Sequence, residues 1–126
     1  INEEKELNAK HYHQYPTIFI SFKDAKATTY QDAISMLAHI VGELYGKYQS
    51  EQLFSHLRED EIKTFERIAN KSATITELKT SLVKLIKFLH CLNKKQVIVL
   101  IDEYDTPVHA AYHNNYYDEF IDVFNY

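Results

Sequence analysis

The chain has 126 residues, 45% of them hydrophobic and 25% charged, a balance typical of one folded domain. It contains no apolar run of the roughly 20 residues that cross a bilayer, which excludes an integral membrane protein. Its net charge of −4 argues against a nucleic-acid-binding surface. The single cysteine excludes an intramolecular disulfide, and with a polar start that does not resemble a signal peptide it favours a reducing compartment, so we expect the cytoplasm.

The first expected strand follows Pro16. Residues 1–15 are polar and mixed and predict a frayed helix or a linker, in which His11 and His13 lack a third nearby metal ligand. Residues 17–22 read Thr-Ile-Phe-Ile-Ser-Phe, a β-rich and nearly continuous apolar run. This pattern is typical of a strand covered on both faces.

Helices are expected throughout the middle of the chain. A capping-box pattern at Thr28 and Gln31 predicts a helix start, and apolar residues spaced three and four apart continue to about residue 49. Gly42 either weakens this helix or permits close packing. Shorter helices are expected around residues 53–57 and 59–69. A second capping box, at Thr74 and Glu77, opens the strongest helix, whose leucine stripe runs to residue 92.

The second strand is expected at residues 97–101, where five consecutive apolar residues end directly at Asp102 and Glu103. Such a run indicates a central parallel strand between helices. Thr106 as N-cap and Pro107 as first helical residue predict a short helix to Tyr112, and a last helix follows. The order of elements predicts an α/β fold with a right-handed crossover, and two strands imply missing neighbours.

Asp102 and Glu103 carry the chemistry that the pattern suggests. An apolar run followed by Asp-Glu is the Walker B pattern, which delivers carboxylates to the edge of the sheet where ligands bind. Asp102 can hold the water shell of a Mg²⁺ ion that bridges nucleotide phosphates, and Glu103 can orient or deprotonate the attacking water. The alternative is a strand that ends in a solvated acidic turn. With only two glycines the chain contains no P-loop, so nucleotide hydrolysis requires one upstream of the first residue.

Charge is unevenly distributed along the chain. No Lys or Arg follows Lys95, whereas this last stretch contains six carboxylates. An acidic segment of this kind faces a cation, a basic surface or water. For Asp118, Glu119 and Asp122 we expect water.

Two further residue groups point to other chemistry. His109 and His113 have a spacing that can bind Zn²⁺, but the Glu of a metalloprotease motif is absent, so an exposed helix face is expected instead. Cys91 could be a thiol nucleophile, but its place near the end of the leucine-striped helix predicts burial.

Three strings in the chain resemble one family. Residues 97–107 read Val-Ile-Val-Leu-Ile-Asp-Glu-Tyr-Asp-Thr-Pro, residues 114–119 read Asn-Asn-Tyr-Tyr-Asp-Glu, and residues 15–24 read Tyr-Pro-Thr-Ile-Phe-Ile-Ser-Phe-Lys-Asp. Together they resemble the AAA-ATPase-like family, bacterial and archaeal P-loop ATPases that are often fused to a C-terminal nuclease-like domain of the PD-(D/E)XK type. The resemblance runs from about residue 10 to the end, and Asp-Glu-Tyr-Asp-x-Pro is more specific than a bare Walker B motif.

The resemblance implies a partial P-loop NTPase-type α/β fold, with parallel strands at about 17–22 and 97–101 linked by a multi-helix crossover. Residues 1–126 would then be a fragment of one domain, without its upstream P-loop and the downstream part of its sheet. Within that domain ATP and Mg²⁺ would be bound, with Asp102 as the magnesium-associated acid and Glu103 as the catalytic glutamate. Asp105 has no assigned role in the match and is expected to cap the turn before Pro107.

Two functions remain open from the sequence. The first is an ATP-hydrolysing domain, in which the isolated fragment is inactive. The second is a non-enzymatic protein-interaction module with a degenerate nucleotide site. Expected partners are the nucleotide, a fused nuclease-like domain and, through exposed sheet edges, a second copy of the chain, with no membrane and no nucleic-acid surface in this segment.

Overall fold

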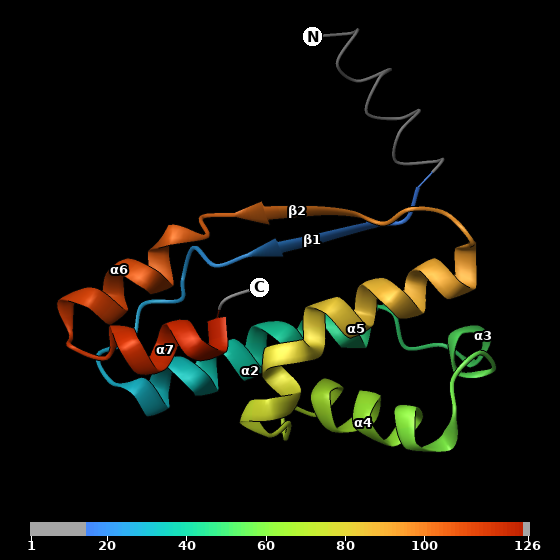
Figure 1. Cartoon of the computed structure of the whole chain (residues 1–126), viewed down its shortest axis with the longest axis horizontal. Helices are drawn as coiled ribbons and strands as arrows, with labels where there is room; N and C mark the ends of the chain where they lie inside the picture. The colour runs from blue at the N-terminus through green and yellow to red at the C-terminus, as the bar shows by residue number, and fades with distance from the viewer. Residues whose placement is uncertain (1–14, 125–126) are drawn as a thin grey trace, which may run out of the picture.

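The computed structural model describes residues 15–124 and is a mixed α/β structure. In this part of the chain, two strands and six helices follow one another (Figure 1): β1 (Thr17–Ser21), α2 (Tyr30–Lys47), α3 (Glu51–Phe54), α4 (Glu59–Ala69), α5 (Ile75–Asn93), β2 (Ile98–Asp102), α6 (Asp105–His113) and α7 (Tyr117–Phe124). The expectations for the segment before Tyr15, including His11 and His13, lie outside the described residues.

β1 and β2 pair in parallel, in a register that places Thr17 opposite Ile98 and Ser21 opposite Asp102. The pairing is extended at one end by Ile98 N–H, which donates to the Pro16 carbonyl at 2.9 Å. The predicted strands are thus confirmed to within one residue, as is the crossover through helices α2 to α5 that links them. On the other edge of β1, the Tyr48 hydroxyl donates to the Thr17 carbonyl at 2.7 Å.

One face of this sheet is open. In Figure 1 helices α2 to α5 and α7 lie on one side of the two strands and α6 lies beyond their carboxyl ends, and the inward side chains of β1, Ile18 and Ile20, are buried. On the opposite face Phe19 is 55% exposed and its register partner Leu100 is 38% exposed. The prediction that both strands are covered on both faces is therefore wrong for the described chain, because no element packs on the outer face.

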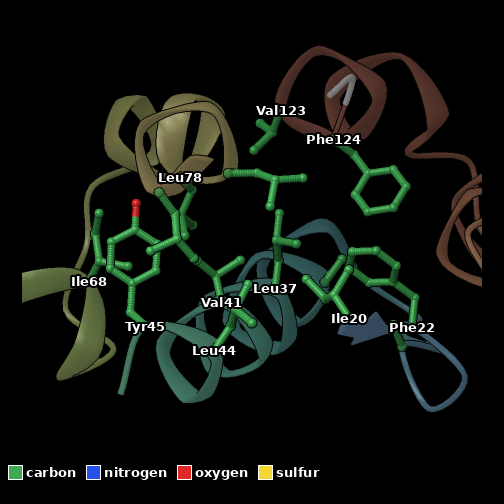
Figure 2. Close-up of a cluster of buried hydrophobic side chains, with 14 of the residues drawn as sticks. Ile20, Phe22, Leu37, Val41, Leu44, Tyr45, Ile68, Leu78, Val123 and Phe124 are labelled. Atoms are coloured by element: carbon green, nitrogen blue, oxygen red, sulfur yellow. The ribbon is translucent and has the colours of Figure 1, made fainter. Parts of the chain in front are cut away.

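α2 forms the centre of the hydrophobic core. Its inward residues Leu37, Val41 and Tyr45 are buried, and Figure 2 shows them between the side chains of β1, α4, α5 and α7. The buried Tyr45 hydroxyl donates to the Ser81 carbonyl on α5, so its polar end is satisfied. The hydrophobic core of the described residues is thus built around one helix.

Helix α2 begins one residue later in the chain than the capping pattern predicted. Thr29, not Thr28, is the N-cap, and its hydroxyl accepts from the Asp32 N–H at 3.2 Å. Both threonines have a polar residue three positions on, so the pattern alone did not distinguish them. The capping-box prediction for Thr28 and Gln31 is therefore wrong by one residue.

Gly42 lies where α2 and α4 approach closely. A Cβ at this position would lie 2.9 Å from the Ile68 carbonyl oxygen of α4. Gly46, one turn further along the same helix, has open space around it. Close packing, one of the two roles expected for Gly42, is therefore the role that the structure supports.

The capping box of α5 is confirmed. The Thr74 hydroxyl accepts from the Glu77 N–H at 3.1 Å, and the Glu77 carboxylate accepts from the Thr74 N–H at 2.9 Å. The same carboxylate accepts from the Arg67 guanidinium of α4, and this contact holds the pKa of Glu77 below its ordinary value. Glu77 therefore both starts α5 and links it to α4.

The last two helices pack against the start of the chain. α6 begins at Asp105 with Tyr104 as its N-cap, so the predicted start at Thr106 and Pro107 is wrong by two residues. The Tyr116 hydroxyl donates to the Ala27 carbonyl at 2.7 Å, which joins the region between α6 and α7 to the loop after β1. Among the helices of residues 15–124, none combines the length and the apolarity needed to cross a bilayer.

Candidate functional site

Asp102 is the last residue of β2 and is exposed at the carboxyl end of the sheet. Its main chain is tied to β1, because the Phe22 N–H donates to the Asp102 carbonyl at 3.0 Å. Its side chain is tied to the same strand, because the Ser21 hydroxyl donates to Asp102 Oδ2 at 3.2 Å. The parallel register brings this serine and this aspartate together from positions 81 residues apart.

The Ser21 hydroxyl has a second contact, which favours donation of its proton to the Asp102 carboxylate. The Lys23 N–H donates to Ser21 Oγ at 3.4 Å. A hydroxyl has one proton and two acceptor lone pairs. Since the Lys23 amide occupies an acceptor side of the oxygen, the proton is available for the Asp102 carboxylate.

Glu103 lies in the turn between β2 and α6 and has a left-handed backbone, with φ of 51°. The Thr106 N–H donates to the Glu103 carbonyl at 3.2 Å, which closes the turn. The Thr106 hydroxyl also donates to Glu103 Oε2 at 3.2 Å. The exposed glutamate is therefore held at the start of α6 by Thr106.

Tyr104 anchors this turn to the core. Its hydroxyl donates to the Phe124 carbonyl at 3.3 Å. Its ring lies 4.7 Å from the ring of Phe124 and 6.3 Å from that of Phe22, centroid to centroid. The residue directly after the two acids is thus fixed by both the strand end and the last helix.

Neither of the two carboxylates has an ion-pair partner in the described chain. Between residues 15 and 124, no Lys, Arg or His nitrogen lies within the 4.0 Å ion-pair distance of Asp102 or Glu103. Elsewhere in the acidic segment, Asp122 pairs with Lys79 at 2.7 Å, although its side chain is still 73% exposed. The prediction that Asp122 meets only water is corrected by this ion pair.

Asp102 also borders a hollow of about 720 Å³ between β1 and α2. Phe19 and Ser21 of β1 line it from the strand, and Met36 and His39 line it from the helix. A second hollow of about 390 Å³ lies between α6 and the loop after β1. The first hollow therefore adjoins the carboxyl end of the sheet, where ligands bind in open α/β folds.

The other candidate groups do not form a site. Asp105 is the first residue of α6 and does not cap it; its carboxylate lies 3.6 Å from His109 Nε2, and both side chains are exposed. His113 follows on the same helix, and among residues 15–124 no group of three His, Cys, Asp or Glu side chains is placed to hold a metal ion. Cys91 is exposed on α5, so its predicted burial is wrong.

Ser21 and Thr106 are the two site residues that sequence reasoning missed. Ser21 is the one hydroxyl residue near the end of an apolar strand, but only the strand register reveals its partner. Thr106 was assigned to cap α6, whereas its hydroxyl contacts Glu103. A threonine three residues after a glutamate was the available signal.

One of three comparisons with known proteins agrees with the strings in the sequence. Neither a curated protein nor a solved structure gave a significant match. A family model described as "Predicted AAA-ATPase" matches residues 1–126, the whole of the chain. The chain therefore belongs to the AAA-ATPase-like family.

Proposed function

We propose that the chain supplies the acidic part of a Mg-ATP hydrolysis site, in a domain of the P-loop NTPase type. The observation that carries the proposal is the position of Asp102 and Glu103. They are consecutive, exposed and unpaired at the carboxyl end of β2, in a chain that belongs to an ATPase-like family. In a Walker B motif the end of a parallel strand presents acids to a nucleotide, and the position of Asp102 and Glu103 supports this proposal.

The groups at this edge fit a magnesium ion. Asp102, Glu103 and Ser21 offer only oxygen atoms, and Mg²⁺ prefers oxygen ligands and retains several waters. Asp102 would hold the ion through its coordinated water. Bound Mg²⁺ neutralises the negative charge that develops on the phosphate oxygens during transfer.

Glu103 would act on the attacking water. Thr106 engages one carboxylate oxygen, Oε2, and no group of the described residues donates to Oε1. Oε1 therefore remains to accept a hydrogen bond from a water and orient it. Asp102 and Glu103 would thus have different tasks, and their different partners support this, since Ser21 donates to Asp102 and Thr106 donates to Glu103.

The phosphate-binding loop of this site would lie outside the 126 residues. The chain has two glycines, Gly42 and Gly46, and both are in the packed helix α2. Neither belongs to a Gly-x-x-x-x-Gly-Lys-Ser/Thr motif. We accordingly propose that an upstream P-loop of the same gene product completes the site.

The test is ATP turnover by the full-length protein beside its Glu103→Gln variant, with Mg²⁺ present. Removal of a general base or water-orienting group lowers turnover by about 100-fold or more. We expect the variant to keep nucleotide binding and lose turnover. Glu119→Gln is the matched control, because Glu119 is an exposed acid of α7 outside the site.

Two results would contradict the proposal. Equal turnover by the wild-type and Glu103→Gln proteins would remove Glu103 from the hydrolytic step. Failure of the full-length protein to bind Mg-ATP would leave Asp102 and Glu103 as an acidic strand end, and an interaction module would then be the better description.

A further inference from the structure

We propose that Ser21 is a positioning residue for Asp102, which sets the affinity of the site for its divalent cation. The inference rests on the proposed function, since it assigns to Asp102 the role of holding Mg²⁺. It concerns the neighbouring strand, which the Asp-Glu pattern does not include. The contact that suggests it is the hydrogen bond from Ser21 Oγ to Asp102 Oδ2, at 3.2 Å.

The two residues are held opposite each other by the sheet. Ser21 and Asp102 are the last register pair of β1 and β2, and paired residues of parallel strands present their side chains on the same face. The Phe22 N–H to Asp102 carbonyl bond continues the ladder directly beyond this pair. The backbone of Ser21 therefore cannot move away from that of Asp102 without loss of strand pairing.

The serine hydroxyl restricts the Asp102 side chain without neutralising it. With Oδ2 engaged by the hydroxyl, Oδ1 is left to face the cation or its water shell. No positively charged group of residues 15–124 lies within 4.0 Å of this carboxylate. A neutral donor thus orients the ligand while its full charge stays available, which is how groups behind metal ligands act in characterised sites.

The experiment uses the full-length protein and Mn²⁺ as a spectroscopic substitute for Mg²⁺. Mn²⁺ affinity in the presence of ADP is measured by electron paramagnetic resonance for wild type, Ser21→Ala and Ser21→Thr. Loss of a group behind a metal ligand lowers metal affinity by about 10- to 100-fold. We expect about 10-fold weaker Mn²⁺ binding for Ser21→Ala, and near-wild-type binding for Ser21→Thr, which keeps the hydroxyl.

Ser35→Ala is the matched control. Ser35 lies on α2 and lines the same hollow as Asp102, but it makes no hydrogen bond to the carboxylate. Its Mn²⁺ affinity is expected to equal that of wild type. The Mg²⁺ dependence of ATP turnover gives a second readout, and Ser21→Ala is expected to need more Mg²⁺ for half-maximal turnover while the maximal rate changes less.

The outcomes separate this inference from the proposed function. If wild type binds Mn-ADP and turns over ATP while Ser21→Ala keeps the wild-type Mn²⁺ affinity, the inference is wrong and the proposed function stands. Lower thermal stability of the metal-free Ser21→Ala protein, with unchanged affinity, would likewise reduce Ser21 to a structural residue. If wild type binds no Mn-ADP, the proposed function fails, and the inference fails with it.

Discussion

Glu103 is unusual among the residues that adopt a positive φ. In residues 15–124, the other non-glycine examples are Lys71, Lys94 and Asn115, and each lies directly at or after the end of a helix. A left-handed residue is common at that position. Glu103 instead follows a strand. The left-handed conformation costs any residue with a Cβ about 1–2 kcal/mol, and here no helix end accounts for it. The strain falls on the residue proposed to orient water, consistent with the tendency of strained residues to cluster at functional sites.

The two glycines of α2 provide a prediction at the same scale. Gly42→Ala is expected to lower the free energy of unfolding by about 1–3 kcal/mol, because the new Cβ would overlap the Ile68 carbonyl oxygen, which is backbone and cannot rotate away. Gly46→Ala is the matched control. It meets open space and is expected to raise the free energy of unfolding by up to about 1 kcal/mol through helix propensity.

Urea unfolding of the two variants measures both changes. Opposite signs would support the close approach of α2 and α4 at Gly42. Equal stabilisation by both alanines would contradict it.

At the scale of elements, the junction of α4 and α5 depends on one carboxylate. Glu77 accepts from Arg67 and from the Thr74 N–H, and both contacts are made by its charged form. The hydrogen bond from Arg67 is the main reason that the pKa of Glu77 lies below its ordinary value. A carboxylate with a lowered pKa in the folded state stabilises the fold above its unfolded pKa of about 4.3, and this contribution is lost as the pH falls through the folded-state value.

Glu77→Gln is therefore expected to lower the free energy of unfolding at pH 7, by about 1 kcal/mol for the weakened cap and ion pair. The difference from wild type should shrink as the pH falls below about 4. Glu43→Gln is the control, because the Glu43 pKa is also lowered, by Lys71, but its exposed pair has no capping role. A Glu77→Gln effect that is constant from pH 7 to pH 3 in denaturant titrations would contradict this assignment.

The elements themselves were largely predictable, and the reasons are local. The leucine stripe and the Thr74–Glu77 capping box specify α5 within its own residues, and both were confirmed. The first residue of a helix was less predictable where adjacent residues were equally suitable N-caps or where the N-cap contacts distant residues. Thr28 and Thr29 carry the same hydroxyl, and the N-cap of α6, Tyr104, contacts Phe22 and Phe124, which lie far away in sequence.

For the candidate site, the sequence predicted which acids end the strand but not what holds them. Asp102 and Glu103 are adjacent in the chain, so their position follows from one apolar run. Ser21 meets Asp102 only through the register of two strands separated by four helices. The apolar run also did not predict that Leu100 is exposed. An apolar strand is expected to be covered, but its sequence does not tell whether the covering element belongs to the same segment of chain.

At the scale of the whole molecule, the outer face of the sheet should govern association. Phe19 and Leu100 are register partners and are both exposed on this face. We expect the 126-residue chain to self-associate, and the double variant Phe19→Thr with Leu100→Thr to reduce association with little change in the free energy of unfolding. Exposed apolar side chains contribute little to folding, and threonine suits a strand.

Sedimentation velocity over a range of concentrations measures this association. Ile20→Ala is the contrasting variant: the side chain faces the core and is only 3% exposed, so its loss should cost about 2–5 kcal/mol of unfolding free energy. A double variant that associates as strongly as wild type would show that another surface is responsible.

The hydrogen bond between Tyr48 and Thr17 makes one edge of the sheet less accessible to a further strand than the other. Because the Pro16 carbonyl faces β2, the Thr17 carbonyl faces the opposite edge, and the Tyr48 hydroxyl already occupies it. Burial raises the pKa of Tyr48, so this hydroxyl keeps the proton that it donates. An incoming strand would have to displace it to hydrogen-bond along the whole of β1. We therefore expect a further strand to add beside β2, next to Asp102, and not beside β1.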